Sequence, residues 1–302
     1  MRKYRYTAAV LASGVLWGVI GIFVRALDGV GADSMQIVFL RSFFSAVLLL
    51  LSLALFRRDL IRIRLRDLWC FIGTGLCSLA FFNFCYFYSI TTVSLSVASV
   101  LLYTAPAFVA VMSAVLFGER LNAIRLLCLG LAIVGCVLVT GVLFEDHSLS
   151  FYGIMTGLGA GFGYALYSIF GRYALNRGYH TLTVNLWTFL IASLSIVWFV
   201  RPIELIKTVS TASFPWYAVV CLVLVSTLIP YLLYTYGLTG MESGRASVLA
   251  TVEPVVATLT GILLFGETLT VFNVLGILLV LGAVALLNLP ASKKEKNNTE
   301  GI

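Results

Sequence analysis

Charged side chains are scarce in this sequence. Asp, Glu, Lys and Arg make up 11% of its 302 residues, whereas 61% of the residues are hydrophobic. A soluble globular protein carries about 25% charged residues, so this chain has too few to coat a water-exposed surface. The composition therefore argues against soluble domains and indicates a protein surrounded largely by lipid.

Histidine is scarcer still, and cysteine has no metal-site spacing. The two histidines, His147 and His180, lie in polar segments between apolar runs, so no His–carboxylate metal site is available inside the membrane. No nucleophile-elbow or paired-aspartate pattern is present either. We expect no catalytic residues, no metal site and no cofactor. The cysteines all fall inside apolar runs and are interpreted as packing residues: Cys70, Cys77, Cys85, Cys128, Cys136 and Cys221.

Long apolar runs are what the sequence has in abundance. Runs of about 20 residues recur along the chain, each long enough to cross a hydrocarbon core of roughly 30 Å. The first run is full length and lacks a small-residue cleavage site, so we interpret it as a span and not as a signal peptide. The fold class is predicted to be an all-α integral membrane protein with ten transmembrane helices. They are expected near 7–26, 34–56, 68–90, 94–117, 123–142, 151–174, 181–200, 215–238, 242–265 and 270–289.

The distribution of basic residues predicts the orientation. Lys and Arg gather at the N-terminus, in alternate loops and in the tail, whereas Asp28, Asp33, Glu145 and Asp146 lie at the opposite helix ends. The positive-inside rule therefore places both termini in the cytoplasm. The net charge of +7 is explained by topology and by contact with anionic lipid, and it does not imply a nucleic-acid partner.

The sequence repeats itself. "YTAPAFVAVMSAVLFGE" (103–119) aligns without a gap on "TVEPVVATLTGILLFGE" (251–267), and Arg25 pairs with Arg172 in a second matching block. We predict a first five-helix repeat over 7–142, a second over 151–289 and a basic cytoplasmic tail over 290–302. Because each repeat has an odd number of spans, the second must insert upside down relative to the first. Inverted repeats are typical of secondary transporters that work by alternating access.

These motifs resemble the EamA branch of the drug/metabolite transporter superfamily. The resemblance rests on the two-by-five pattern, Trp17-Gly18 in the first span, "LRSFFSA" in the second and the repeated Pro…Gly-Glu spans. "EPVVATLTGILLFGE" is similar to the ninth span of members that export amino acids and related metabolites. The resemblance implies a cavity between the first, third, fourth, sixth, eighth and ninth spans. It also implies that the fifth and tenth spans lie at the periphery, where they are often linked to homodimer contacts.

Two ionisable residues lie deep inside predicted spans. Glu253 is near the middle of the span at 242–265, and Arg41 lies inside the span at 34–56. Burying either in lipid costs at least a few kcal/mol, so each should face a partner or water. Their repeat counterparts are Ala105 and approximately Thr188, so both charges break the internal symmetry. They could pair with each other as a structural ion pair. Alternatively, Glu253 could bind a substrate amine or carry a proton, and Arg41 could hold a substrate carboxylate.

Aromatic and amide residues supply further candidates for a substrate site. Asn83 needs hydrogen-bond partners inside its span, and Tyr231 lies near mid-span beside a proline. An aromatic lining suits cationic or zwitterionic amines through cation–π contacts. The remaining candidates are Trp17, Tyr103, Tyr164, Tyr167 and Ser168.

Prolines and glutamates mark the ends and bends of the repeated spans. Pro106 and Pro254 should kink their helices and are candidates for gating, because proline removes a backbone hydrogen bond. Glu119 and Glu267 follow Phe-Gly at helix ends. We interpret them as partners of basic loop residues or caps of the next helix, with alternate latching of the two faces as the other possibility.

The sequence thus predicts a secondary transporter, an exporter of small zwitterionic metabolites such as amino acids, in the plasma membrane of a bacterium. The expected partners are a small-molecule substrate, the lipid bilayer and, as a candidate coupling ion, the proton. Cationic amines, aromatic drugs, organic acids and sugar-like metabolites remain alternative cargoes. The absence of a filter-like repeat and the presence of an inverted repeat favour a carrier over a channel.

Overall fold

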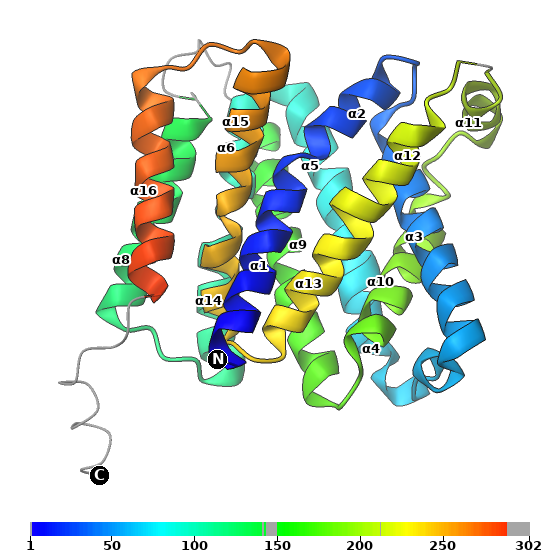
Figure 1. Ribbon diagram of the computed structural model, residues 1–302, viewed down its shortest axis with the longest axis horizontal. Helices are drawn as coiled ribbons and strands as arrows, with labels where there is room; N and C mark the ends of the chain where they lie inside the picture. Colours follow the sequence, from blue (N-terminus) through cyan, green and yellow to red (C-terminus); the bar gives the residue numbers. More distant parts are fainter. Residues whose placement is uncertain (1, 141, 143–149, 212, 289–302) are drawn as a thin grey trace.

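The computed structural model describes residues 2–140, 142, 150–211 and 213–288. The predictions for Glu145, Asp146, His147 and the basic tail at 290–302 fall outside the described residues. The described part of the chain is built from helices packed in one bundle (Figure 1).

The helices of the first half of the chain lie between residues 2 and 139. They are α1 (Arg2–Gly18), α2 (Ile20–Asp28), α3 (Ser34–Phe56), α4 (Leu68–Ile72), α5 (Phe81–Thr92), α6 (Leu95–Leu102), α7 (Ala105–Phe117) and α8 (Ala123–Val139). Two short 3₁₀ turns, Arg58–Ile61 and Leu65–Asp67, precede α4, and a π-helical segment, Gly73–Ala80, joins α4 to α5.

The helices of the second half lie between residues 150 and 288. They are α9 (Phe151–Asn176), α10 (Thr181–Ile196), α11 (Pro202–Val209), α12 (Trp216–Val223), α13 (Ile229–Leu238), α14 (Ser243–Ala250), α15 (Val252–Phe265) and α16 (Val271–Asn288). A π-helical segment, Leu224–Leu228, joins α12 to α13, as Gly73–Ala80 joins α4 to α5 in the first half.

Eight of the helical stretches are long and apolar enough to cross a membrane. The apolar helices Ala123–Val139 and Thr181–Ile196 are shorter. The span predicted at 181–200 ends at Ile196, and the helix α11 that follows was not predicted. Pro202 explains this new helix, because a proline in the first turn has the backbone angle of a helix and needs no hydrogen bond there. The first helix begins at Arg2, before the predicted boundary at residue 7.

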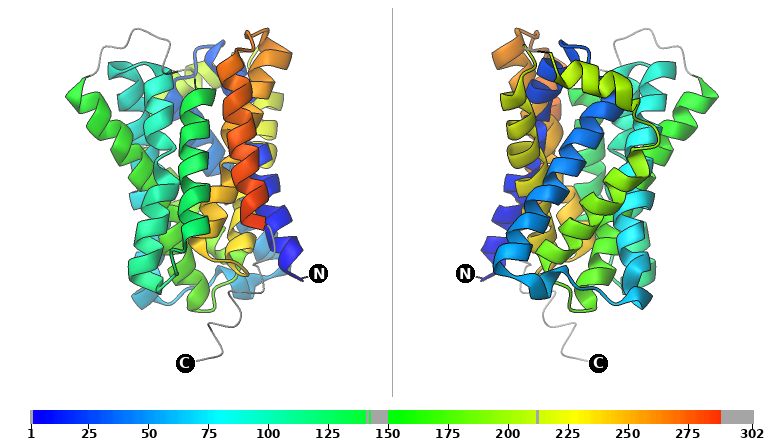
Figure 2. Two further views of the ribbon diagram at one scale, coloured as in Figure 1. Left: turned by 90° about the vertical axis from the view of Figure 1, so that its left-hand side faces the viewer. Right: turned by 90° about the vertical axis from the view of Figure 1, so that its right-hand side faces the viewer.

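The two halves run in opposite directions through the bundle. In Figure 1, α1 begins at the lower end and α8 reaches the upper end, whereas α9 begins at the upper end and α16 returns to the lower end. Figure 2 gives the same arrangement from two sides. The beginning of α1 and the end of α16 therefore lie at the same end of the bundle.

Two helices are interrupted just before a proline. Tyr103 and Thr104 separate α6 from α7, and Thr251 separates α14 from α15. Pro106 and Pro254 follow these breaks in the first turn of the next helix, where the missing N–H is not needed by the helix. The structure thus places a helix break at equivalent points of the two halves.

Helices α8 and α16 pack against each other at one side of the bundle (Figures 1 and 2). Gly135 and Gly276 allow a close approach. A Cβ atom at Gly276 would lie 2.6 Å from the carbonyl oxygen of Gly135 and 2.8 Å from the amide nitrogen of Val139. Small residues at such a contact let helix backbones meet where lipid supplies no hydrophobic drive.

This contact predicts a stability difference between two glycines of one helix. Gly276→Ala should destabilise the protein by about 1–3 kcal/mol, because the added methyl group meets backbone atoms of α8 that cannot move aside. Gly282→Ala is the matched control, since a Cβ there meets nothing within 4 Å. Thermal unfolding in detergent measures both. Equal unfolding temperatures for the two variants would contradict the close packing of α8 on α16.

Candidate substrate site

Two small cavities lie among the helices, and Tyr164 borders both. They have volumes of about 10 Å³ and about 20 Å³, room for at most one water molecule each. The aromatic cavity is lined by Trp17, Ser78, Phe82, Tyr164, Tyr167, Ser168, Tyr231 and Tyr234. The acidic cavity is lined by Leu102, Tyr103, Ala105, Pro106, Tyr164, Ser247, Ala250, Thr251 and Glu253.

Trp17 of α1 contacts three of the other aromatic rings that line the aromatic cavity. Its ring centroid lies 5.2 Å from that of Tyr231 and 5.5 Å from that of Tyr234, both on α13. It also lies 6.3 Å from the ring centroid of Tyr164 on α9, at a steep interplanar angle. Edge-to-face contacts of this kind are favourable between aromatic rings. Helices α1, α9 and α13 therefore share one aromatic wall.

Hydrogen bonds hold Tyr167, Ser168 and Tyr234 in place at the aromatic cavity. The Tyr167 hydroxyl donates to Asn185 Oδ1 at 3.1 Å and lies 2.6 Å from Thr235 Oγ1. Ser168 Oγ lies 2.7 Å from the Tyr234 hydroxyl. Such buried networks hold side chains in one geometry. Asn185 and Thr235 were not among the predicted residues, and their only signal in the sequence is a polar side chain inside an apolar run.

Glu253 lies in the first turn of α15, immediately after the helix break at Thr251. Its Oε2 atom accepts a hydrogen bond from the Tyr164 hydroxyl at 3.2 Å. The amino end of a helix carries a partial positive charge, which favours a carboxylate there. The helix break thus explains why a carboxylate is tolerated among the packed helices, and Tyr164 connects it to the aromatic cavity.

Arg41 of α3 is buried, with 7% of its surface exposed. Its Nη2 atom donates to Asn83 Oδ1 at 3.5 Å, a long hydrogen bond, and Asn83 Nδ2 donates to the carbonyl oxygen of Leu79. Within the described part of the chain, Arg41 Nε has no hydrogen-bond partner and no carboxylate oxygen lies within 4.0 Å of the guanidinium. Arg41 nevertheless lies close enough to Glu253 and Tyr231 to interact with them electrostatically. The structure therefore has a buried cation with incomplete hydrogen bonding.

The predicted site residues fall into three groups. Trp17, Tyr164, Tyr167, Ser168 and Tyr231 line the aromatic cavity. Glu253, Tyr103 and Pro106 line the acidic cavity. Arg41, Asn83 and Pro254 line neither cavity, although Arg41 lies near Tyr231, Glu253 and Tyr164, which do.

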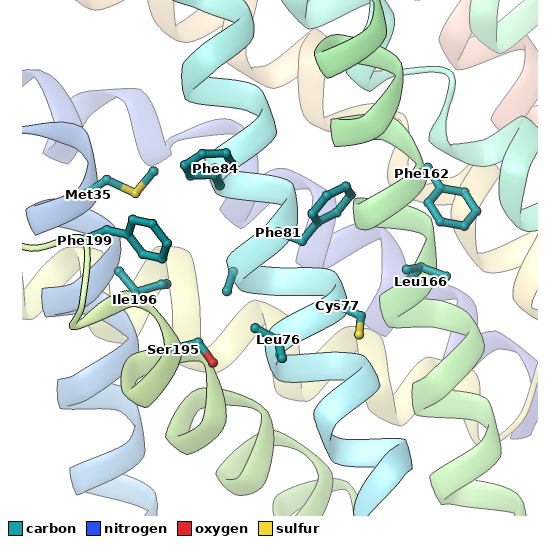
Figure 3. Close-up of a pocket in the computed structure, with 11 residues that line it drawn as sticks. Met35, Leu76, Cys77, Phe81, Phe84, Phe162, Leu166, Ser195, Ile196 and Phe199 are labelled. Carbon is teal, nitrogen blue, oxygen red and sulfur yellow. The ribbon is translucent and has the colours of Figure 1, made fainter.

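A larger cavity of about 520 Å³ is lined by residues of α3, the π-helical segment Gly73–Ala80, α5, α9 and α10, together with Phe199. Figure 3 shows its lining, which is apolar apart from the hydroxyl of Ser195. Several of its residues, including Phe81, Phe84 and Phe199, are substantially exposed at the surface of the bundle. It offers no charged group that could select a polar solute, so the smaller aromatic and acidic cavities are the better candidate site.

Comparisons with known proteins agree with this architecture. The EamA-like transporter family matches residues 6–141 and again 151–289. An uncharacterized transporter of Archaeoglobus fulgidus is 30% identical over 290 residues, which cover 94% of this chain and 97% of that protein. The threonine/homoserine exporter RhtA of Escherichia coli is 29% identical over 211 residues, covering 68% of this chain and 65% of RhtA. A crystal structure that is 17% identical has the same fold, with a TM-score of 0.77 over 94% of this chain and 96% of its own. The protein is a multi-pass membrane protein and belongs to the EamA-like transporter family.

Proposed function

We propose that the protein is a secondary transporter that exports small zwitterionic metabolites, such as amino acids, by alternating access. In this proposal the two shorter apolar helices also span the bilayer, which gives ten spans in two inverted repeats. Both termini then face the cytoplasm, since the lower end of the bundle in Figure 1 carries most of the basic residues. The membrane is the plasma membrane of a bacterium.

One observation carries the choice of cargo. Glu253 and Arg41 are opposite charges that interact electrostatically, yet they do not form a direct ion pair within 4.0 Å among the described residues. A buried charge without a close partner is costly, so each gains from a ligand group of opposite charge. A zwitterion supplies both groups in one small molecule. Its ammonium group would meet Glu253, and its carboxylate would meet Arg41.

The aromatic cavity supports the same cargo class. Tyr164 contacts Glu253 and shares the aromatic cavity with Trp17 and Tyr231, and a cation is attracted to the faces of such rings. The printed name of one relative, a threonine/homoserine exporter, also supports an amino acid. Since the two cavities are now too small for such a molecule, binding requires Tyr164 and its neighbours to move apart.

Coupling and assembly belong to the same proposal. Glu253 is the candidate proton carrier, because a carboxylate beside a water-sized cavity can exchange a proton when substrate leaves. Arg41 holds its proton permanently and cannot take that part. Helices α8 and α16 lie at one side of the bundle and are the candidate contact of a homodimer (Figure 1).

Three other cargo classes would use less of the site. A cationic amine or an aromatic drug would bind Glu253 and the aromatic wall without Arg41. An organic acid would use Arg41 without Glu253, and a sugar-like solute would need neither charge. Comparison of ligands that differ by one charged group separates these classes.

Thermal unfolding of the purified protein tests the proposal. The panel contains amino acids, their decarboxylated amines, organic acids and aromatic drugs, and Glu253→Gln is measured beside the native chain. Stabilisation by an amino acid that is lost in the variant supports the zwitterion site. Stabilisation by organic acids alone, or equal stabilisation of both proteins, contradicts it.

A further inference from the structure

A cluster of contacts at the lower end of the bundle joins the two halves of the chain. Glu119, just after α7, accepts hydrogen bonds from the backbone N–H groups of Ser243 at 2.7 Å and Gly244 at 3.0 Å. It therefore caps α14 of the opposite half, whereas we predicted that it would meet a basic loop residue or cap the next helix along the chain. Carboxylate contacts with backbone N–H groups at a helix start are strong hydrogen bonds.

Arg172 of α9 binds the chain segment that leads into the start of α14. It donates to the carbonyl oxygen of Leu238 at 2.6 Å, to the carbonyl oxygen of Met241 and to Ser243 Oγ at 3.2 Å. Arg172 and Glu119 thus bind the segment 238–244, which links α13 to α14. We call this set of contacts the lower clamp.

Every part of the lower clamp has a counterpart in the other half of the chain. Arg25 aligns with Arg172, and Glu267 aligns with Glu119. The segment 90–96, which links α5 to α6, aligns without a gap on 238–244, since "ASV" at 98–100 lies over "ASV" at 246–248. Because the repeats are inverted, these counterparts lie at the upper end of the bundle (Figure 1).

At the upper end the counterparts make different contacts. Arg25 Nη2 lies 2.6 Å from Glu267 Oε1, and the Arg25 guanidinium lies 3.9 Å from the centroid of the Phe265 ring. Both side chains are about half exposed, at 55% and 49%. The start of α6 has a cap of its own, because Ser94 Oγ accepts from the backbone N–H of Val97. At the lower end, Glu119 and Arg172 therefore both bind the segment 238–244, whereas their counterparts Glu267 and Arg25 bind each other at the upper end.

We propose that these residues form two alternating clamps, and that the structure has the lower clamp engaged and the upper clamp released. In the alternate state Glu267 accepts from the backbone N–H groups of Leu95 and Ser96. Arg25 then donates to the carbonyl oxygens of Ile90 and Val93, while Glu119 releases α14. The inference rests on the proposed alternating access and adds the residues that hold each end shut.

The two clamps are expected to allow two conformations of similar free energy. Each state makes one set of charge-assisted hydrogen bonds and breaks the equivalent set at the other end. The two states then differ little in free energy, so that binding of a small substrate can shift the population between them. Arg25 and Glu267, paired in water-exposed surroundings, give up a weak interaction when the upper clamp forms.

Hydrogen–deuterium exchange on the full-length protein in lipid nanodiscs tests the clamps. In Glu119→Gln, backbone amides at 243–250 should exchange about tenfold faster, because the charge-assisted hydrogen bonds to Ser243 and Gly244 are weakened. Amides at 95–102, at the far end of the bundle, should exchange more slowly, because the population moves toward the engaged upper clamp. Glu267→Gln should have the opposite effect at each end.

The controls separate coupling from a local cap. Glu204→Gln removes an exposed carboxylate that pairs with Arg201, and it should leave exchange at both clamps unchanged. Glu267 is exposed, so its variant is expected to fold even if Glu119→Gln does not. Faster exchange confined to 243–250 in Glu119→Gln, with no change at 95–102 in either variant, would overturn the clamps and leave Glu119 as a helix cap. If the clamps are overturned in this way but a zwitterion still binds, the proposed function stands. If exchange changes in opposite directions at the two ends but no zwitterion binds, only the proposed cargo is refuted.

Discussion

Glu253→Gln is expected to raise the KM for a transported amino acid about 100-fold or more, because it removes the carboxylate that would bind the substrate ammonium. The glutamine amide has nearly the same size and can still accept from the Tyr164 hydroxyl, which now donates to Glu253 at 3.2 Å. The variant should therefore fold. Transport of labelled amino acid in proteoliposomes measures the change, and the unfolding temperature without ligand checks the fold.

Tyr164→Phe is the matched control for this prediction. It removes the hydrogen bond to Glu253 and keeps both the charge and the aromatic ring that contacts Trp17. The expected loss of affinity is about tenfold, the size of one hydrogen bond to a charged group. A KM for Glu253→Gln within about threefold of the native value would mean that Glu253 does not contact the substrate.

Arg41→Gln is expected to change selectivity rather than stability. Affinity for the amino acid should fall about 100-fold, because the variant cannot bind the carboxylate with two parallel hydrogen bonds. Affinity for the corresponding amine, which has no carboxylate, should change by less than about threefold. Arg41→Lys retains the charge without the planar fork and should give an intermediate loss for the amino acid. Competition of unlabelled amino acid and amine against labelled substrate measures both affinities.

The stability of Arg41→Gln distinguishes a binding role from a structural one. In the described structure Arg41 has one long hydrogen bond to Asn83 and an Nε atom without a partner. Removal of a buried charge with so few partners should leave the unfolding temperature unchanged or raise it. A fall in unfolding temperature, with equal losses of affinity for amino acid and amine, would assign Arg41 to the scaffold.

Much of the fold could be predicted from hydrophobicity alone. Apolar runs of about 20 residues indicate spans directly, because the bilayer sets their length. The interruptions are harder, since the breaks at Thr251 and at Tyr103–Thr104 are single turns inside apolar runs. Pro254 and Pro106 gave a signal for them, but a proline indicates only that a helix is perturbed nearby and not on which side it ends.

The candidate site was predictable where a residue breaks the pattern of its own span. Glu253 and Arg41 stood out as charges in apolar surroundings, and the aromatic residues stood out by type. Which of them meet was not predictable, because the contacts of Trp17 with Tyr164 and Tyr231 join three helices distant in sequence. The partner of Glu119 was equally hidden, since it lies in the opposite half of the chain.

Counterflow in proteoliposomes tests the central claim most directly. The labelled probe is the amino acid that stabilises the protein best, and the vesicles are preloaded with the same amino acid unlabelled. An alternating-access carrier with a zwitterion site predicts saturable flux, faster entry of label into preloaded vesicles and a transient accumulation of label inside them. Flux that rises linearly with concentration and is unaffected by preloading would contradict the account and indicate a channel.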